Sequence, residues 1–502
     1  MLLGVLVWAI VVLTLLPALK TPVAALFPTL LACLVAGGVI GPGVQAALRG
    51  GRARRLPVAA AGPGRRRVVI LGGGFGGVSA ARRFEQLLPW SPWLDVTLVS
   101  QRNYLLFTPM LAEVAAGSVE AGNVGVPLRA ACPRTRFRRA EVLGVDPDQR
   151  VVHLRRGDAL ETLPYDQLVL ALGAVPNFRD LPGVATNALT LATLEDARRL
   201  RDHVLGRLEQ ADHEPDPAER RRWLTFVVAG GGFAGTEAVA SLFDLVHSVL
   251  RYFPHVRASE PRFVLVHSRD RILPELGDRL AGYASGKLVA RGIELRLGVT
   301  VTGADADGVL LSDGERVAAR TLVWAAGTRP SPLPLAGPEG SFRGPAPGVG
   351  AVPVDRALRV RGSDNIWAVG DCARVPDLAA RRGATCPPTA QHAVRQGRAV
   401  ADNVVAALTG GQPEPFRFRG LGFLVPLGRQ SAAAELRGMR FSGLPAWLLW
   451  RGVYLWKLPG PQKRLRVLVD WTVELLFPRD IALTTAERHP APAVPRTPPA
   501  VE

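Results

Sequence analysis

The sequence predicts an α/β protein in which one Rossmann-like dinucleotide-binding domain is inserted into another. An apolar run, a G-x-G-x-x-G turn and a small-residue helix start occur together at 68–77 and again at 226–235. From Arg65 onward, runs typical of strands alternate with runs typical of helices. One such turn is weak evidence, because glycine also serves ordinary surface turns. Two turns with the same flanking pattern indicate two bound dinucleotides.

Residues 1–50 are predicted to form a transmembrane hairpin. The stretch 2–19 carries no charge and is roughly long enough to span a hydrocarbon core, and a second apolar stretch follows Lys20. A signal peptide is the alternative, but the N-terminus lacks a basic start, and the apolar length is about double what the apolar region of a signal peptide needs. The Arg-rich linker at 51–64 would hold the catalytic domain on the cytoplasmic side of the cell inner membrane.

The length and net charge of the chain indicate what kind of partner it binds. The chain has 502 residues, too many for one core, and a formal net charge of +18. A strongly basic protein is attracted to anionic surfaces. Nucleic acid is not predicted, because the sequence has no zinc-ligand spacing, basic zipper or single-strand-binding aromatic platform. A lipid bilayer fits better, and no metal site is predicted.

The domain order follows from the position of the second glycine turn. After it, the chain returns to a strand that ends in Gly370 and Asp371, which belongs with the first turn. One nucleotide domain therefore interrupts the other. The predicted division is an outer domain at 65–190 and 331–410, an inner domain at 191–330, a third block at 411–482 and a disordered Pro- and Ala-rich tail at 483–502.

Several motifs together resemble one family. Besides both glycine turns, they are NYLLFTP at 103–109, WAAG at 324–327, the Gly370–Asp371 pair and AQHAVRQG at 390–397. The chain resembles the type II NADH dehydrogenases, single-subunit flavoproteins that pass electrons from NADH to a quinone without pumping protons. The resemblance implies FAD in the outer domain, NADH or NADPH in the inner domain and a quinone as acceptor. It leaves a homodimer open.

The FAD site is predicted at the first turn. Gly72, Gly74 and Gly77 allow the backbone to approach a pyrophosphate. An acidic residue usually follows the second strand to hold the ribose, but Ser100 stands there and would bind a hydroxyl more weakly. The resemblance adds three residues to the FAD site: Pro109, Asp371 and Gln391.

The nicotinamide dinucleotide is predicted at the second turn, through Gly230, Gly232 and Gly235. The resemblance adds Gly327. Glu237 is expected in the first turn of the following helix, where a carboxylate complements the helix dipole. The resemblance instead places Glu237 near the nicotinamide and the flavin, in a proton or hydrogen-bond relay, and one residue can do both.

The choice between NADH and NADPH stays open. A carboxylate after the second strand of the inner domain would favour NADH by binding the ribose 2′-hydroxyl. His267 stands there instead, followed by Arg269, and these residues would tolerate a 2′-phosphate. Arg269 is equally consistent with a solvated surface charge.

Two glutamines are predicted to be catalytic. The resemblance places Gln391 against the isoalloxazine ring and the quinone headgroup, with Gln396 on the same helix. That helix is expected to begin near Thr389, so that its N-terminus stabilises negative charge at the flavin. A plain helix cap after the preceding prolines would explain Thr389 but not the whole motif.

Two alternatives to the dehydrogenase remain. A sulfide–quinone oxidoreductase shares the architecture and needs a reactive thiolate pair, for which Cys132 and Cys386 are the candidates. The absence of C-x-x-C pairs indicates reduced, unremarkable thiols. A flavin-bearing redox sensor with slow turnover is the second alternative, because Ser100 and His267 replace both nucleotide-site carboxylates.

The block at 411–482 is predicted to associate with a membrane. It contains a Trp- and Tyr-rich run at 446–459, flanked by Arg and Lys, and a second apolar run at 465–477. Such residues suit the headgroup level of a bilayer, although an amphipathic packing helix is the more common use of such a run. The resemblance favours the membrane, because the family draws quinone from the bilayer at its C-terminal helices.

Overall fold

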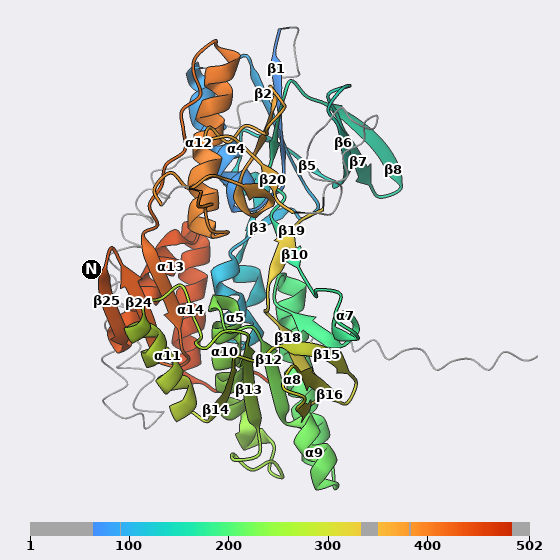
Figure 1. Ribbon diagram of the computed structural model, residues 1–502, viewed down its shortest axis with the longest axis vertical. Coiled ribbons are helices and arrows are strands. Elements are labelled where there is room, and N and C mark those ends of the chain that lie inside the picture. The colour runs from blue at the N-terminus through green and yellow to red at the C-terminus, as the bar shows by residue number, and fades with distance from the viewer. Residues whose placement is uncertain (1–63, 91, 333–349, 381–382, 484–502) are drawn as a thin grey trace, which may run out of the picture.

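The computed structural model describes residues 64–90, 92–332, 350–380 and 383–483 (Figure 1). The predicted hairpin at 1–50 lies outside these residues, as do the linker before Gly64 and the tail after Leu483. Within the described ranges, one helix, Phe233–Tyr252, is long and apolar enough to cross a membrane, and half of it is buried inside the protein. Because a buried core helix meets the same criterion, this helix is no sign of a membrane span.

The first parallel sheet has the order β21-β9-β1-β2-β5. Val68 to Leu71 of the central strand are fully buried, as expected of a strand covered on both faces. The strands are β1 (Arg66–Leu71), β2 (Leu94–Ser100), β5 (Arg136–Arg139), β9 (Gln167–Leu170) and β21 (Ile366–Ala368). The contribution of 366–368 confirms that a late segment of the chain returns to the first sheet.

The second parallel sheet has the order β11-β18-β12-β13-β14. Its strands are β11 (Ala188–Thr190), β12 (Thr225–Ala229), β13 (Arg262–His267), β14 (Ile293–Leu297) and β18 (Thr321–Trp324). Residues 188–190 were predicted to belong to the outer domain, but they pair with β18 of the inner sheet. The chain therefore crosses between the domains earlier than the sequence suggested.

A short antiparallel ladder joins the two sheets. It pairs β10 (Ala174–Pro176) with β19 (Thr328–Pro330) (Figure 1). The first lies where the chain leaves the outer domain, and the second lies where the chain returns to it. The two Rossmann-like domains thus lie one above the other in Figure 1, with the crossover between them. This arrangement confirms the predicted α/β class and the insertion of one nucleotide domain into the other.

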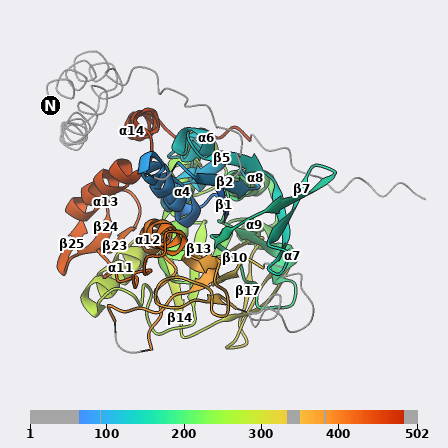
Figure 2. The ribbon, with the colours of Figure 1, turned by 90° about the horizontal axis from the view of Figure 1, so that it is seen from above.

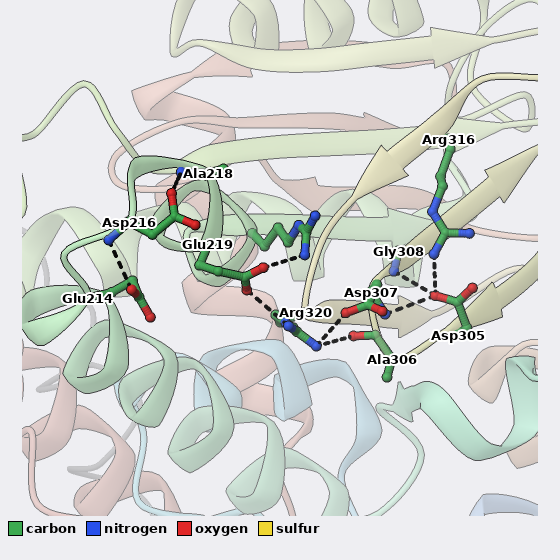
Figure 3. Close-up of polar contacts among 11 residues, drawn as sticks. Glu214, Asp216, Ala218, Glu219, Asp305, Ala306, Asp307, Gly308, Arg316 and Arg320 are labelled. Carbon is green, nitrogen blue, oxygen red and sulfur yellow. Dashed lines mark hydrogen bonds and ion pairs between the residues drawn. The ribbon is translucent and has the colours of Figure 1, made fainter.

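Each parallel sheet carries a three-stranded antiparallel ladder. In the outer domain these strands are β6 (Glu141–Asp146), β7 (Val151–Arg156) and β8 (Ala159–Pro164), and in the inner domain β15 (Val301–Asp305), β16 (Gly308–Leu311) and β17 (Arg316–Ala318). Arg320 ties the inner ladder to α9 (Pro217–Trp223), because its guanidinium binds Glu219 at 3.0 Å and Asp307 at 2.8 Å (Figure 3).

Two long helices pack together beside the first sheet. They are α4 (Phe75–Leu87), which follows the first glycine turn, and α12 (Ala390–Leu408). A Cβ atom on Gly397 would lie 2.2 Å from the carbonyl oxygen of Gly76. Only glycine permits this approach, so the AQHAVRQG segment is held directly against the helix of the first turn.

The C-terminal block packs on the inner domain and shares its core. Trp447, Trp450 and Trp471 are buried in one cluster with Val239 and Leu245. The block consists of β23 (Gly422–Pro426), β24 (Ala432–Leu436), β25 (Met439–Gly443), α13 (Leu444–Lys457) and α14 (Pro461–Leu476). The helices around it are α5 (Leu111–Ala115), α10 (Phe233–Val249) and α11 (Asp278–Ala290). A further helix, α8 (Leu194–His213), packs against α5. Figure 2 shows α13 and the β23–β25 sheet on the opposite side of the molecule from β7.

Candidate active site

The first glycine turn has a shape that only glycine allows. Gly72 has a φ of +111°, and a Cβ atom there would lie 2.1 Å from the carbonyl oxygen of Ala171. A Cβ atom on Gly77 would lie 1.9 Å from the carbonyl oxygen of Gly72. Gly74 differs, because a Cβ atom there would meet nothing within 4 Å. The turn therefore leaves open space at the N-terminus of α4.

The second turn repeats this geometry. Gly230 has a φ of +108°, and its Cβ atom would lie 2.4 Å from the carbonyl oxygen of Ala325. A Cβ atom on Gly235 would lie 1.8 Å from the carbonyl oxygen of Gly230, whereas one on Gly232 would meet nothing within 4 Å. The second turn thus leaves the same open space at the N-terminus of α10.

Neither helix that follows a glycine turn has a capping side chain. The N-caps Gly74 and Gly232 make no side-chain cap, whereas α12 begins at a Thr389 hydroxyl that accepts a hydrogen bond from the backbone. The first N–H groups of a helix need partners, and an anion such as pyrophosphate supplies them. Both turns therefore offer the donors and the space that a dinucleotide requires.

Gln396 holds the Gly370–Asp371 turn. Its side-chain oxygen accepts a hydrogen bond of 2.8 Å from the backbone N–H of Gly370, and its side chain is buried. Burial raises the pKa of the neighbouring Asp371 carboxyl above its ordinary value. Ser100 ends β2 beside the first turn, since a Cβ atom on Gly73 would lie 2.8 Å from the Ser100 hydroxyl oxygen. Gln396, which is predicted to be catalytic, makes this contact with the Gly370–Asp371 turn in the structure.

One large cavity of about 1670 Å³ lies between the two domains and the C-terminal block. Its walls include the starts of α4, α10 and α12, which contribute Phe75, Phe233 and Gln391, together with Tyr454 of α13. Of the predicted site residues, Pro109, Glu237 and Gln391 line this cavity, whereas Gln396, Ser100, Asp371, His267, Gly327 and the six turn glycines lie outside its walls. The cavity therefore brings together the residues predicted to face the flavin and the quinone.

Gln391 connects α12 to the C-terminal block. Its amide nitrogen donates to the carbonyl oxygen of Gly422 at 3.2 Å, and its amide oxygen accepts from the backbone N–H of Leu421 at 3.1 Å. An amide group carries two N–H donors. One donor of Gln391 therefore stays available to a ligand in the cavity.

Glu237 lies deeper in its helix than predicted. The first turn of α10 contains no acidic residue, so Glu237 does not complement the helix dipole there. The side chain lines the cavity, and burial raises its pKa well above the ordinary value, with a smaller contribution from the nearby Glu113. Burial therefore favours the protonated form of this carboxyl group, which is the form that can serve as an acid.

The aromatic run at 446–459 faces inward more than the sequence suggested. Trp447 and Trp450 are buried, and only Trp456 is well exposed, at 60%. The ring of Tyr454 packs edge-on against Phe107, with 6.0 Å between ring centres, and lines the cavity. These rings shape the cavity wall, a role that the sequence pattern alone does not distinguish from a membrane belt.

His267 is neutral and tied to the second turn. Its Nδ1 atom accepts a hydrogen bond of 3.1 Å from the backbone N–H of Gly231, so the proton is carried by Nε2. Burial, followed by the charge of Arg269, lowers the pKa of His267. Gly327 follows β18 at the carboxyl edge of the same sheet, where it is exposed and has a φ of +129°.

The three cysteines in the described part of the chain are buried or half-buried. Within the described residues, none of them lines the large cavity, and all three that are described carry free thiols. Burial raises the pKa of Cys132 to about 12 and that of Cys386 to about 11. Since the thiolate is the reactive form, the geometry gives the sulfide–quinone alternative no support.

Sequence reasoning missed Glu113, a second carboxyl group close to Glu237. It lies in α5, an otherwise apolar segment, where its carboxylate accepts a hydrogen bond of 3.2 Å from the indole of Trp471. Burial raises its pKa to about 7. A single acidic residue within an apolar run was the only signal, and nothing local linked it to α10.

Comparisons with known proteins agree with this geometry. Residues 66–397 match the pyridine nucleotide-disulphide oxidoreductase family, and residues 421–480 match the NDH2 C-terminal domain. The chain is 32% identical over 439 residues to the type II NADH:quinone oxidoreductase Ndh of Mycobacterium tuberculosis, which covers 85% of this chain and 92% of that protein. It is 33% identical over 417 residues to the demethylphylloquinone reductase NdbB of Synechocystis, which covers 81% of this chain and 96% of that protein.

A solved structure shares the fold. The NDH2 of Plasmodium falciparum in complex with NADH aligns with a TM-score of 0.74 at 19% identity, over 83% of this chain and 100% of that chain. The sequence matches cover both nucleotide domains and the C-terminal block. The chain therefore belongs to the type II NADH:quinone oxidoreductase family, within the pyridine nucleotide-disulphide oxidoreductases.

Proposed function

We propose that the protein oxidises NADH and reduces a membrane quinone, with FAD as its bound cofactor. The observation that carries this proposal is the large cavity, which reaches the starts of both glycine-turn helices and of α12 and continues into the C-terminal block. A reductant bound at the inner domain and an acceptor bound at the C-terminal block would therefore meet the same reaction space. The names of two related proteins agree with this, since one is an NADH:quinone oxidoreductase and the other a demethylphylloquinone reductase.

The residues of the outer domain fit FAD. The open N-terminus of α4 at Gly74 would hold the pyrophosphate, and Ser100 and Asp371 lie at the ends of β2 and β21 to meet the ribose and ribityl hydroxyls. When bound, FAD supplies the redox chemistry by accepting a hydride and giving up two electrons. The protein supplies position, through the glycine turn and through Gln396, and excludes water with the rings of the cavity wall.

Two polar residues would act on the quinone in the cavity. Gln391 keeps one amide N–H free to donate to a quinone oxygen. Burial favours the protonated form of Glu237, which would give its proton to the other quinone oxygen. The proposed roles therefore differ, since Gln391 orients the acceptor and Glu237 protonates it.

NADH is the proposed reductant. His267 is neutral, so it adds no positive charge for a 2′-phosphate, and Arg269 is exposed to solvent. A comparison of kcat/KM for the two nucleotides measures the preference directly, and a higher value with NADPH would contradict it. A variant Arg269→Ala shows whether that side chain contributes to any NADPH use.

The proposed membrane contact is the outer face of α14. Leu465, Val469, Val473 and Phe477 follow one another at four-residue intervals and are each about half exposed, while Leu468 and Leu475 on the other face line the cavity. A stripe of this kind suits the boundary of a bilayer, from which quinone would enter. Together with the predicted hairpin at 1–50, it would hold the protein on the cytoplasmic side of the inner membrane.

The test is the stoichiometry of the reaction. Purified full-length protein in liposomes that contain a ubiquinone or menaquinone analogue should form one quinol for each NADH oxidised, without oxygen. Sulfide in place of NADH should give no quinol. Quinol formation from sulfide alone, or NADH oxidation that does not depend on quinone, would contradict the proposal.

A further inference from the structure

A second, small cavity adjoins the large one. Its volume is about 40 Å³, enough for on the order of one to three water molecules, since one water needs about 10–15 Å³. Five residues line both cavities: Pro109, Glu237, Trp447, Arg451 and Leu475. The carboxyl of Glu237 therefore lies in the wall between the two spaces.

The small cavity extends away from the active site toward the surface. Its lining includes the exposed Arg429, in the turn between β23 and β24, and the hydroxyl-bearing Ser118 and Ser241. Polar side chains of this kind give water molecules the partners that a buried water needs. The small cavity thus has the room and the polar partners for water between the exposed Arg429 and Glu237.

The carboxyl groups around the small cavity are of two kinds. Glu474 is fully paired, because it accepts from Arg451 at 3.1 Å, Arg479 at 2.6 Å and Ser118 at 2.8 Å. Asp244 is paired with Arg291. Glu113 accepts only the indole N–H of Trp471 among the described residues, and Glu237 has no hydrogen-bond partner among them.

Glu474 has a lowered pKa, because Arg479 and Arg451 outweigh the effect of its burial, whereas burial raises the pKa values of Asp244, Glu113 and Glu237. Glu113 and Glu237 lie on α5 and α10, which pack together, and both side chains face the small cavity. A negative charge on one disfavours a negative charge on the other. A proton taken up by Glu113 is therefore readily passed to Glu237 when Glu237 has lost its own.

The proposed reaction needs such a supply. NADH, one proton and a quinone give NAD⁺ and a quinol, so that the hydride provides two electrons and one proton and the second proton must come from water. We infer that Glu113 and the small cavity deliver this proton to Glu237, which passes it to the quinone oxygen. The inference rests on the proposed quinone reduction and adds Glu113 as a residue that acts through Glu237.

Other charged groups set the environment of Glu113. They come from every element packed around it: Glu237 and Asp244 of α10, Arg451 and Tyr454 of α13, Glu474 of α14 and Arg479 after it, Arg429 of the β23–β24 turn, and Arg201 of α8, which contacts Gly117. The charges of Arg451 and Arg479 lower the pKa of Glu113. Both guanidinium groups form their ion pairs with Glu474, so neither is paired with Glu113.

The test uses Glu113→Gln, which keeps an acceptor for Trp471 but carries no proton. In anaerobic rapid mixing, the rate of flavin reduction by NADH should stay within about twofold, while reoxidation by quinone should slow by about tenfold or more. Formate, a small weak acid, should restore part of the rate, and Glu113→Asp should retain more activity than Glu113→Gln. In the resting Glu113→Gln protein, the infrared band of protonated carboxyl groups should lack one pH-dependent component that the wild type shows, namely that of Glu113.

Asp470→Asn is the matched control. Asp470 lies on α14 and accepts hydrogen bonds from Glu120 and Asn123, so it ties the same segments together but lines neither cavity. Its rates should match the wild type. If Glu113→Gln reoxidises at the normal rate, or if Asp470→Asn slows equally, the relay is wrong. If the wild-type flavin is not reoxidised by quinone, the proposed function fails instead.

Discussion

Glu113 is a carboxyl group that the fold keeps protonated. Burial raises its pKa from 4.5 to about 7, partly offset by Arg451. Between these two pH values the unfolded chain loses the proton while the folded chain keeps it, so stability falls as the pH rises through this window. One pKa unit corresponds to about 1.4 kcal/mol, which gives a total of roughly 3 kcal/mol.

The Glu113→Gln variant should remove this loss. The free energy of unfolding, measured with denaturant, should increase in the variant relative to the wild type as the pH rises from about 4.5 to about 7. At higher pH the difference between the two proteins should stay constant. The expected gain is roughly 3 kcal/mol or less, because the surroundings relax. Two curves that run parallel across the whole range would show that Glu113 ionises normally.

The glycines and the catalytic glutamine show what local sequence can reveal. Gly72 and Gly230 were predicted from spacing alone, since a backbone turn depends on its own residues. Gln391 followed from the AQHAVRQG motif and lines the cavity. Glu113 and Tyr454 were not predicted, because each reaches the site only through tertiary packing, from a segment far from either glycine turn.

The α4–α12 pair holds the two halves of the outer domain together. Because a Cβ atom on Gly397 would meet the backbone of Gly76 at 2.2 Å, a larger residue must push the helices apart. Gly397→Ala should therefore lower the free energy of unfolding by about 1–3 kcal/mol. It should also weaken FAD retention on gel filtration, since α12 carries both glutamines.

Gly286→Ala provides the comparison. Gly286 is exposed in the middle of α11, and a Cβ atom there would meet nothing within 4 Å. Alanine should stabilise this helix by about 0.5–1 kcal/mol and leave FAD retention unchanged. If the two variants behaved alike, the close helix contact would not be a structural requirement.

The outer stripe of α14 should decide membrane binding. Val469→Glu together with Val473→Glu places two charges on the proposed lipid face and should reduce the fraction of protein that co-sediments with anionic vesicles. Val289→Glu, on an exposed apolar position of α11, should leave binding unchanged. Both proteins should lack residues 1–50, so that the predicted hairpin does not mask the effect. Equal binding of the two would exclude this face.

The C-terminal elements show why a pattern can mislead. Both helices were predicted as membrane-associating from aromatic and basic residues, yet Trp447, Trp450 and Trp471 are buried against the inner domain. A sequence gives the same aromatic stripe for a protein core and for a bilayer interface. Only the packing of α13 against the inner domain separates them, leaving α14 as the exposed apolar face.

At the scale of the whole molecule, repetition made the fold predictable. Two copies of the same strand–turn–helix unit, with a strand at 366–368 that returns to the first sheet, specify the insertion of one domain in the other. The crossover was placed too late, because β11 is only three residues long and gives little pattern. The cavity between domains could not be predicted, since it exists only where three distant parts of the chain meet.

The most direct test of the account follows flavin absorbance in the purified protein without oxygen. Addition of NADH should bleach the absorbance, and a quinone analogue should then restore it as fast as steady-state turnover. This result would show that both substrates reach one flavin. Failure of NADH to bleach the flavin, or bleaching that sulfide causes and quinone reverses, would contradict the central claim.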